Sequence, residues 1–291
     1  MFQGSIAALV TPMHNDGSLA KDALCALLDW HIQNGTQGIV IAGTTGESAT
    51  LELEEKECLI RLAVKHAAKR IPVIAGTGSN NTHATIQSTK LAQKAGADAC
   101  LIVTPYYNKP TQKGLVAHYE AITKEVDLPI ILYNVPSRTN CDLLPDTVEK
   151  LSHLSSIIGI KEATGKIERA SEIRERCGDH FLIYSGDDET ALALIQRGAK
   201  GVISVTANVA PKEMQHMCTA ALTGNYSLAE SINQQLMPLH QKLFLESNPI
   251  PVKWALYKMG KISGGIRLPL LPLDEHYHSD LEKAMQIAGV L

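Results

Sequence analysis

The chain has 291 residues, of which 45% are apolar and 20% are charged, and its formal net charge is -3. This composition is typical of a globular protein with a sizeable core. It argues against a nucleic-acid partner, which needs a clustered basic face, and against a membrane partner, because Lys and Arg form no long run.

The N-terminal segment and the cysteines favour a cytoplasmic protein. The first apolar segment stops at Pro12 and no basic leader precedes it, so it does not resemble a signal peptide. No stretch approaches the roughly 18 uninterrupted apolar residues of a membrane-spanning helix. The six cysteines form no CxxC pair, which predicts reduced thiols instead of disulfides or a zinc site.

Short apolar runs alternate with helical patterns along most of the chain. Most of these runs are apolar throughout, which is typical of strands that are buried on both faces of a parallel sheet. The expected strands are residues 5–10, 38–42, 72–75, 99–103, 129–132, 157–160, 181–184 and 201–204.

Amphipathic helical patterns separate the strands, as at residues 19–35, 53–69 and 82–96. Eight such strand–helix units within residues 1–224 predict an α/β fold of the (β/α)8 TIM-barrel type. An open dinucleotide-binding sheet is disfavoured, because no GxGxxG motif follows the first strand.

The strand pattern stops after residue 224, and three helical patterns follow at residues 227–246, 250–260 and 274–289. No flexible Ser/Gly linker precedes them. We therefore expect residues 1–224 to form the catalytic barrel and residues 225–291 to form a helical extension that packs on it.

The polar residues after the fifth and sixth strands indicate carbonyl chemistry. Active sites of such barrels lie where the strands end, and Lys161, Tyr133 and Arg138 follow apolar runs there. A lysine amine that is kept neutral by burial or by a nearby cation can form a Schiff base with a ketone. The alternative for Lys161 is a structural ion pair with Glu162 or another carboxylate.

Two further side chains suit a reaction on an anionic substrate. The phenol of Tyr133 can shuttle a proton, although it could be only a packing aromatic at the barrel mouth. The guanidinium of Arg138 is a planar fork for a carboxylate, with a solvated loop charge as the alternative. Thr44 and Thr45, in a glycine-flanked turn, could hold a carboxylate or pass a proton, or could only close the turn.

Other polar motifs favour structural interpretations. Asp187 and Asp188 are expected to cap a helix that begins near Glu189. The eleven histidines include no HxH…H or HExxH set on strand ends, and His276 and His278 lie on different helical faces. We therefore expect no metal, which disfavours a metal-dependent hydrolase or a class II aldolase.

At these residues the chain resembles the dihydrodipicolinate synthase family, within the N-acetylneuraminate lyase superfamily of class I aldolases. The resemblance covers nearly the whole chain. It rests on the segments GSIAALVTP, GTTGESATL, IPVIAGTGSN, VTPYYNKP, LPIILYNVPSRT, IIGIKEATG, SGDD, GVISVTANVAP and NPIPVKWAL.

The resemblance implies an activity and a set of residue roles. Lys161 would form a covalent Schiff base with pyruvate, without a separate cofactor, and the enamine would attack L-aspartate 4-semialdehyde. The implied proton relay consists of Tyr133, Thr44 and Tyr107, with Tyr107 reaching the relay of a neighbouring subunit. Substrate binding falls to Thr45, the backbone at Ile203, Gly186 and Arg138, of which Arg138 would bind the semialdehyde carboxylate.

The family resemblance further implies the first committed step of diaminopimelate and lysine biosynthesis, in a homotetramer built as a dimer of dimers. A pyruvate-dependent sugar-acid aldolase or lyase of the same superfamily is the alternative, and arginine at position 138 argues against it. A non-enzymatic scaffold fits poorly, because no expected catalytic position is missing.

One departure from the family concerns feedback inhibition by L-lysine. Four positions of the implied lysine-effector site match sensitive members, namely Ser48, Ala49, Asn80 and Tyr106. Three others differ, because Leu53, Lys56 and Ala84 stand where two histidines and a glutamate are expected. A cation at position 56 and a missing carboxylate at position 84 predict weak or absent inhibition by a diamine.

Overall fold

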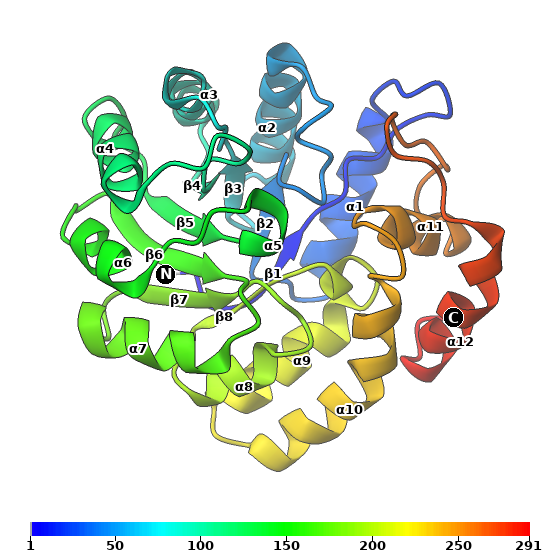
Figure 1. Cartoon of the computed structure of the whole chain (residues 1–291). Helices are drawn as coiled ribbons and strands as arrows, with labels where there is room; N and C mark the ends of the chain where they lie inside the picture. Colours follow the sequence, from blue (N-terminus) through cyan, green and yellow to red (C-terminus); the bar gives the residue numbers. More distant parts are fainter. Residues whose placement is uncertain (1) are drawn as a thin grey trace.

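Eight parallel strands close into a barrel in the computed structural model, which describes residues 2–291 (Figure 1). Each strand pairs with the next along the chain, and the last returns to the first. The strands are β1 (Gly4–Ala8), β2 (Gly38–Ile41), β3 (Val73–Gly76), β4 (Ala99–Val103), β5 (Ile130–Asn134), β6 (Ile157–Glu162), β7 (Leu182–Ser185) and β8 (Gly201–Ser204). The predicted TIM barrel is confirmed.

Helices surround the barrel and cover its outer face (Figure 1). They are α1 (Lys21–Gln33), α2 (Leu53–Ala67), α3 (Thr82–Ala95), α4 (Gln112–Thr123), α5 (Pro136–Thr139), α6 (Pro145–Ser152), α7 (Ile167–Cys177), α8 (Ala191–Gln196) and α9 (Pro211–Leu222), with a 3-10 turn η1 (Thr206–Asn208). The local sequence determines where a helix ends, as at α3. Gly96 follows this helix in the left-handed conformation, which glycine adopts at low cost.

The strands are apolar throughout because both of their faces are buried. Val40 packs inside the barrel with Ile6 and Ile74, whereas its neighbours Ile39 and Ile41 pack in the core beneath the helices. Successive side chains of a strand point to opposite faces, so an apolar run serves two cores at once.

Strands β5 and β6 extend two residues beyond the predicted ends at 132 and 160. The prediction stopped where polar residues begin, but the backbone pairing continues through Tyr133 with Lys161 and Asn134 with Glu162. The prediction that Lys161 and Tyr133 follow their strands is therefore wrong. Both residues lie near the carboxyl ends of β5 and β6, where hydrogen bonds between the two strands hold their backbone.

The C-terminal residues form α10 (Tyr226–Lys242), α11 (Ile250–Lys258), a 3-10 turn η2 (Glu275–Tyr277) and α12 (His278–Ile287). Figure 1 shows them, in yellow to red, along one flank of the barrel. Helix α10 packs against α9 and α12. We call residues 225–291 the extension, and its boundary at residue 225 stays a prediction. Among residues 2–291, no helix has both the length and the apolar character needed to cross a membrane.

Candidate active site

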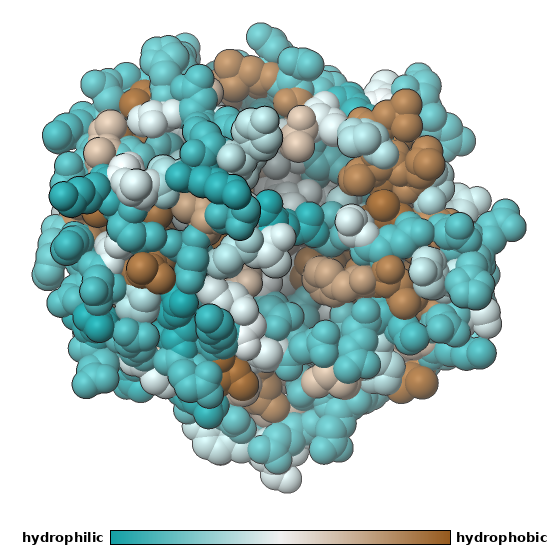
Figure 2. Space-filling model, in the orientation of Figure 1, coloured by the Kyte–Doolittle hydropathy of each residue, from teal (hydrophilic) through white to brown (hydrophobic). Residues whose placement is uncertain are grey.

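A cavity of about 750 Å³ opens at the carboxyl ends of the barrel strands. The space-filling view shows the same face hollowed near its centre (Figure 2). The lining of the cavity includes six residues that the sequence analysis proposed for the site, namely Thr44, Thr45, Tyr133, Arg138, Lys161 and Gly186. Residues from the extension complete the wall, and these are Phe244, Ser247 and Asn248.

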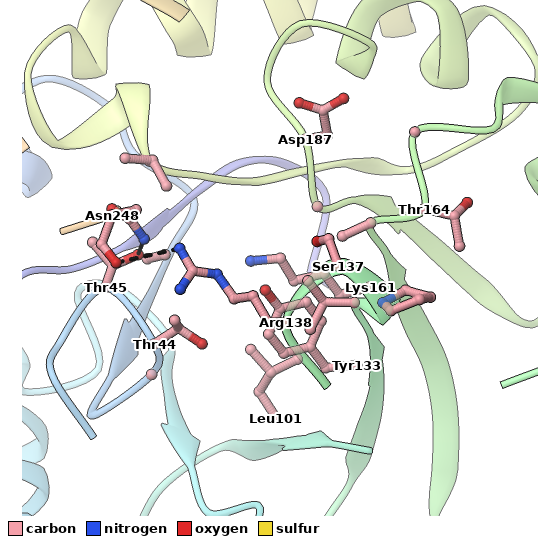
Figure 3. A pocket seen from close by; sticks show the side chains of 18 of the residues that line it. Thr44, Thr45, Leu101, Tyr133, Ser137, Arg138, Lys161, Thr164, Asp187 and Asn248 are labelled. Carbon is pink, nitrogen blue, oxygen red and sulfur yellow. Dashed lines mark hydrogen bonds between the residues drawn. The ribbon is translucent and has the colours of Figure 1, made fainter. Parts of the chain in front are cut away.

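Lys161 and Tyr133 lie side by side on adjacent strands and point into the cavity (Figure 3). The Lys161 Nζ atom lies 4.5 Å from the centroid of the Tyr133 ring. Both residues are buried, with 5% and 7% of their surface exposed. The arrangement places an amine and a phenol where a small carbonyl compound can reach both.

Glycine at position 186 makes room for the Lys161 side chain. A Cβ atom at this position would lie 2.9 Å from Lys161 Cε and 2.6 Å from Ala163 Cβ. Contacts this short would force the lysine or the backbone to move. The structure therefore supplies a steric reason for glycine beside the amine.

The next residues along the two strands, Asn134 and Glu162, are buried and take part in a hydrogen-bond network of their own. Asn134 donates to Asp142 at 2.9 Å and to Glu162 at 3.1 Å, and Glu162 also accepts the backbone N–H of Thr164 at 2.8 Å. Burial raises the pKa of Glu162. Because this carboxyl faces away from the cavity, Glu162 forms no ion pair with Lys161. No carboxylate within residues 2–291 lies within 4.0 Å of the lysine nitrogen.

The threonine turn, residues 43–48, carries Thr44 and Thr45 at the opposite wall. Its backbone folds back on itself, with Glu47 N–H donating to the Thr44 carbonyl at 3.1 Å and Ser48 N–H donating to the Gly43 carbonyl at 3.2 Å. The Thr45 hydroxyl accepts a hydrogen bond from the Asn248 side chain at 3.0 Å. Helix α2 begins only at Leu53, so no regular element holds the turn.

Arg138 comes from the short helix α5 and reaches over the cavity. Its Nη2 group donates to the backbone carbonyl of Asn248 at 3.3 Å. Figure 3 shows the guanidinium directed toward Asn248 and Thr45 from the side of Tyr133. Asn248 therefore contacts both sides of the cavity, through its side chain and through its backbone.

Two other predicted residues lie outside the lining of this cavity. Ile203 is fully buried in β8 and packs in the inner core of the barrel. Tyr107 is 89% exposed, and its backbone has a φ of 73°, in the left-handed region that favours glycine. A single chain thus presents Tyr107 to the outside instead of to Lys161.

The residues of the implied lysine-effector site lie at the end of the threonine turn and directly after it, on α2 and α3, and on the loops after β3 and β4. Tyr106 is exposed, and the carbonyl of Asn80 accepts a hydrogen bond from Asn108 at 2.8 Å. Burial lowers the pKa of the Lys56 amine. Leu53 and Ala84 offer no charge to a ligand here.

The predicted helix cap at Asp187 and Asp188 is wrong. Helix α8 begins later, at Ala191, and no side chain caps its first N–H groups. Asp188 is buried and instead accepts the backbone N–H groups of Val205 and Thr206 at 3.0 and 2.9 Å. Asp187 lines the cavity, and burial together with the charges of Asp188 and Glu189 raises its pKa.

The sequence interpretation missed the contribution of the extension. Asn248 and Lys253 both lie in the segment NPIPVKWAL, yet no role was expected for either. Lys253 stands in an apolar run, which is the same signal that singled out Lys161. Within residues 2–291, no cluster of three His, Cys, Asp or Glu side chains is placed to hold a metal ion.

Comparisons with known proteins cover the whole chain. A family model described as the dihydrodipicolinate synthetase family matches residues 1–288. The chain is 58% identical to the 4-hydroxy-tetrahydrodipicolinate synthase of Alcanivorax borkumensis, over 100% of this chain and 99% of that one. It is 57% identical to the enzyme of the same name from Pseudomonas aeruginosa, over 100% of both chains. The crystal structure of the chloride-inhibited dihydrodipicolinate synthase of Acinetobacter baumannii, complexed with pyruvate, matches with a TM-score of 0.99 and 51% identity over 100% of both chains.

Proposed function

The chain belongs to the dihydrodipicolinate synthetase family, and from this membership we propose that it condenses pyruvate with L-aspartate 4-semialdehyde through a Schiff base on Lys161. It is an enzyme of the lyase class with 4-hydroxy-tetrahydrodipicolinate synthase activity, in diaminopimelate and lysine biosynthesis. The sugar-acid aldolase alternative is not favoured, because relatives that match the full chain carry the synthase name.

The observation that carries the Schiff-base proposal is the placement of Lys161. Its amine is buried at the floor of the cavity, without an ion-pair partner among residues 2–291, and it lies 4.5 Å from the Tyr133 ring. Because no carboxylate is paired with this amine, a ketone that enters the cavity can reach the nitrogen directly. The pyruvate bound by the Acinetobacter baumannii relative supports pyruvate as the first substrate.

The chemistry then follows from the amine. The Lys161 Nζ lone pair adds to the C2 carbonyl of pyruvate, and loss of water leaves the imine. Loss of a proton from C3 gives the enamine, whose carbon attacks the aldehyde of the semialdehyde. The resulting alkoxide takes up a proton and becomes the alcohol, and the imine at C2 is restored. The amine of the semialdehyde then attacks C2, closes the ring and releases the Lys161 amine. We assign these proton transfers to Tyr133 and Thr44.

The two carboxylates of the substrates need separate anchors. We assign the pyruvate carboxylate to Thr45 and its turn, with Ile203 and Gly186 beside the reacting carbon. The semialdehyde carboxylate goes to Arg138, whose fork can bind both oxygens at the cavity mouth. This division keeps the ketone near Lys161 and brings the aldehyde in from the outer side.

The relay is completed by Tyr107 from a second copy of the chain. The exposure of Tyr107 and its place outside the lining of its own cavity support this assignment. The homotetramer with two tight dimers and the cytoplasmic location stay predictions. Sedimentation velocity tests the assembly, and a Tyr107→Phe chain mixed with a Lys161→Met chain tests the exchange of Tyr107 between copies.

Borohydride reduction in the presence of pyruvate tests the Schiff base directly. We expect one pyruvate-derived adduct per chain on the peptide that contains Lys161, located by mass spectrometry. A parallel assay supplies pyruvate with the semialdehyde and, separately, N-acetylneuraminate or keto-deoxy sugar acids. An adduct on another residue, or none, would contradict the mechanism, and turnover of a sugar acid alone would favour the alternative.

A further inference from the structure

Glu47, in the threonine turn, is a buried carboxylate that receives two hydrogen bonds from the extension. One carboxylate oxygen accepts a hydrogen bond from Lys253 Nζ, and the other accepts a hydrogen bond from the backbone N–H of Arg267 at 3.0 Å. The side chain of Glu47 has no exposed surface and that of Lys253 has 5%. The turn is therefore tied to a part of the chain that lies more than 200 residues later.

A buried ion pair of this kind is not needed to hold the fold together. Taking both charges out of water costs about as much as their attraction returns, and apolar side chains of similar size often stabilise a protein equally well. Burial lowers the pKa of Lys253, while the Glu47 carboxylate opposes that shift. The pair differs from apolar packing in one respect. Its hydrogen bonds are directional, so they hold the Glu47 side chain in one position.

That position matters for the residues just before Glu47. Thr45 is two residues away, and Glu47 itself has a φ of 57°, so it turns the backbone sharply. Arg267 supports the far end of the turn, where its guanidinium donates to the Thr50 carbonyl at 2.8 Å and pairs with Glu55 at 2.6 Å. The whole segment between the two threonines and α2 thus rests on the extension.

Asn248 forms a second contact between the same two parts of the chain. It precedes α11 by two residues, whereas Lys253 lies within α11, so both contacts move with one helix. Asn248 donates to Thr45 at 3.0 Å and accepts from Arg138. A displaced α11 would shift the threonine turn at two points.

We propose that the Glu47–Lys253 ion pair is a positioning device that sets the threonine turn against Lys161 and makes the extension a working part of the active site. The inference rests on the proposed function, since it assumes that Thr44 and Thr45 meet pyruvate. It predicts that breaking the pair raises the KM for pyruvate more than the KM for the semialdehyde, because the backbone of Arg138 is held by α5 next to β5 and only its side chain contacts Asn248.

Three variants that break the pair, and Lys253→Arg, which keeps the cation, test this proposal; the three are Glu47→Gln, Lys253→Met and the double variant Glu47→Gln/Lys253→Met. Glu47→Gln keeps the size of the side chain, and the double variant leaves no unpaired charge. We expect kcat/KM for pyruvate to fall about 100-fold in the double variant, the scale of a displacement of about 1 Å. We expect the KM for the semialdehyde to change less than about threefold, and Lys253→Arg to recover part of the loss by keeping the cation.

The control is Lys242→Met, which removes a solvent-exposed ion pair with Asp280 between α10 and α12. It makes the same substitution within the extension without touching the turn, and we expect wild-type kinetics. Equal losses for both substrates that follow the folded fraction, or unchanged pyruvate kinetics in the double variant, would overturn the proposal. If the double variant does not fold, the test uses Glu47→Gln alone. The same comparison, the rise in the KM for pyruvate against the rise in the KM for the semialdehyde, then decides whether the proposal holds. A failure of the proposed function is distinguishable, because wild type would then show no borohydride adduct.

Discussion

The two walls of the active-site cavity are held in different ways. Lys161 and Tyr133 lie within β6 and β5, and backbone hydrogen bonds between the strands place them next to each other. Thr44 and Thr45 lie on an irregular turn, and side chains from the extension hold it through Asn248 and through Glu47. One wall is built by the sheet and the other by contacts over more than 200 residues of chain.

The two walls therefore have different roles: the wall built by the sheet carries the reacting amine, and the wall held by the extension orients the substrate. Two adjacent strands in a closed barrel fix the position of the amine relative to the phenol. Neither strand can slide without breaking its hydrogen bonds to both neighbouring strands. The turn has no such support and depends on a few polar contacts. Substitutions at the first wall should therefore remove chemistry without changing stability, whereas substitutions at the second should change both.

Lys161→Met gives the largest expected effect. Lys161 and Lys253 are equally buried, at 5% exposure each, so the two methionine variants form a matched pair. We expect Lys161→Met to lose about 10⁴-fold or more in kcat, the scale of removing a nucleophile. It leaves no carboxylate unpaired, so its melting temperature should stay at or above that of wild type. Turnover near the wild-type rate, measured with pyruvate and the semialdehyde, would place the nucleophile elsewhere.

Lys253→Met should instead lose stability and bind pyruvate more weakly, while Lys161 can still form its adduct. Removing one member of a buried pair leaves the Glu47 charge without its partner, which costs about 3–5 kcal/mol. We expect urea unfolding to show this loss, and borohydride to label Lys161 in the folded protein when pyruvate is in excess. A Lys253→Met protein as stable as wild type would mean that the pair contributes nothing to the second wall.

Gly186→Ala is the third test and concerns the first wall. The added Cβ atom would lie 2.6 Å from Ala163 Cβ and 2.9 Å from Lys161 Cε, so the lysine side chain or the backbone beside it must move. We expect kcat to fall about 100-fold, with adduct formation slowed in proportion. Gly264→Ala is the control, because its Cβ would meet only ordinary contacts at 3.9 Å. Adduct formation at the wild-type rate in Gly186→Ala would show that the lysine tolerates the displacement.

The same difference between the walls decides how far the sequence could be interpreted. Apolar runs and the residues at their ends predicted the barrel, and they placed Lys161 and Tyr133 at its mouth because active sites of such barrels lie at the carboxyl ends of the strands. The end of β6 was misjudged, since Lys161 and Glu162 look like a loop although their backbone is paired.

The second wall could not be predicted from local pattern. Nothing in the sequence near Glu47 indicates that its partner is Lys253, because long-range side-chain pairs leave no periodicity. Asp188 shows the same limit, since its partners Val205 and Thr206 lie on another loop. A lysine inside an apolar run was the one usable signal, and it applies to Lys253 as well as to Lys161.

The smallest expected effect is the response to L-lysine, and it also bears on the second wall. Ser48 and Ala49 directly follow Glu47, so a ligand bound there could reach the cavity through the threonine turn. Here Lys56 presents a cation and Ala84 lacks a carboxylate, so a diamine meets repulsion without a counter-charge. We expect less than about a twofold change in rate at millimolar lysine. Lys56→His/Ala84→Glu should restore inhibition if these two positions are responsible. Strong inhibition of the wild-type enzyme would instead show that the turn transmits binding even without those charges.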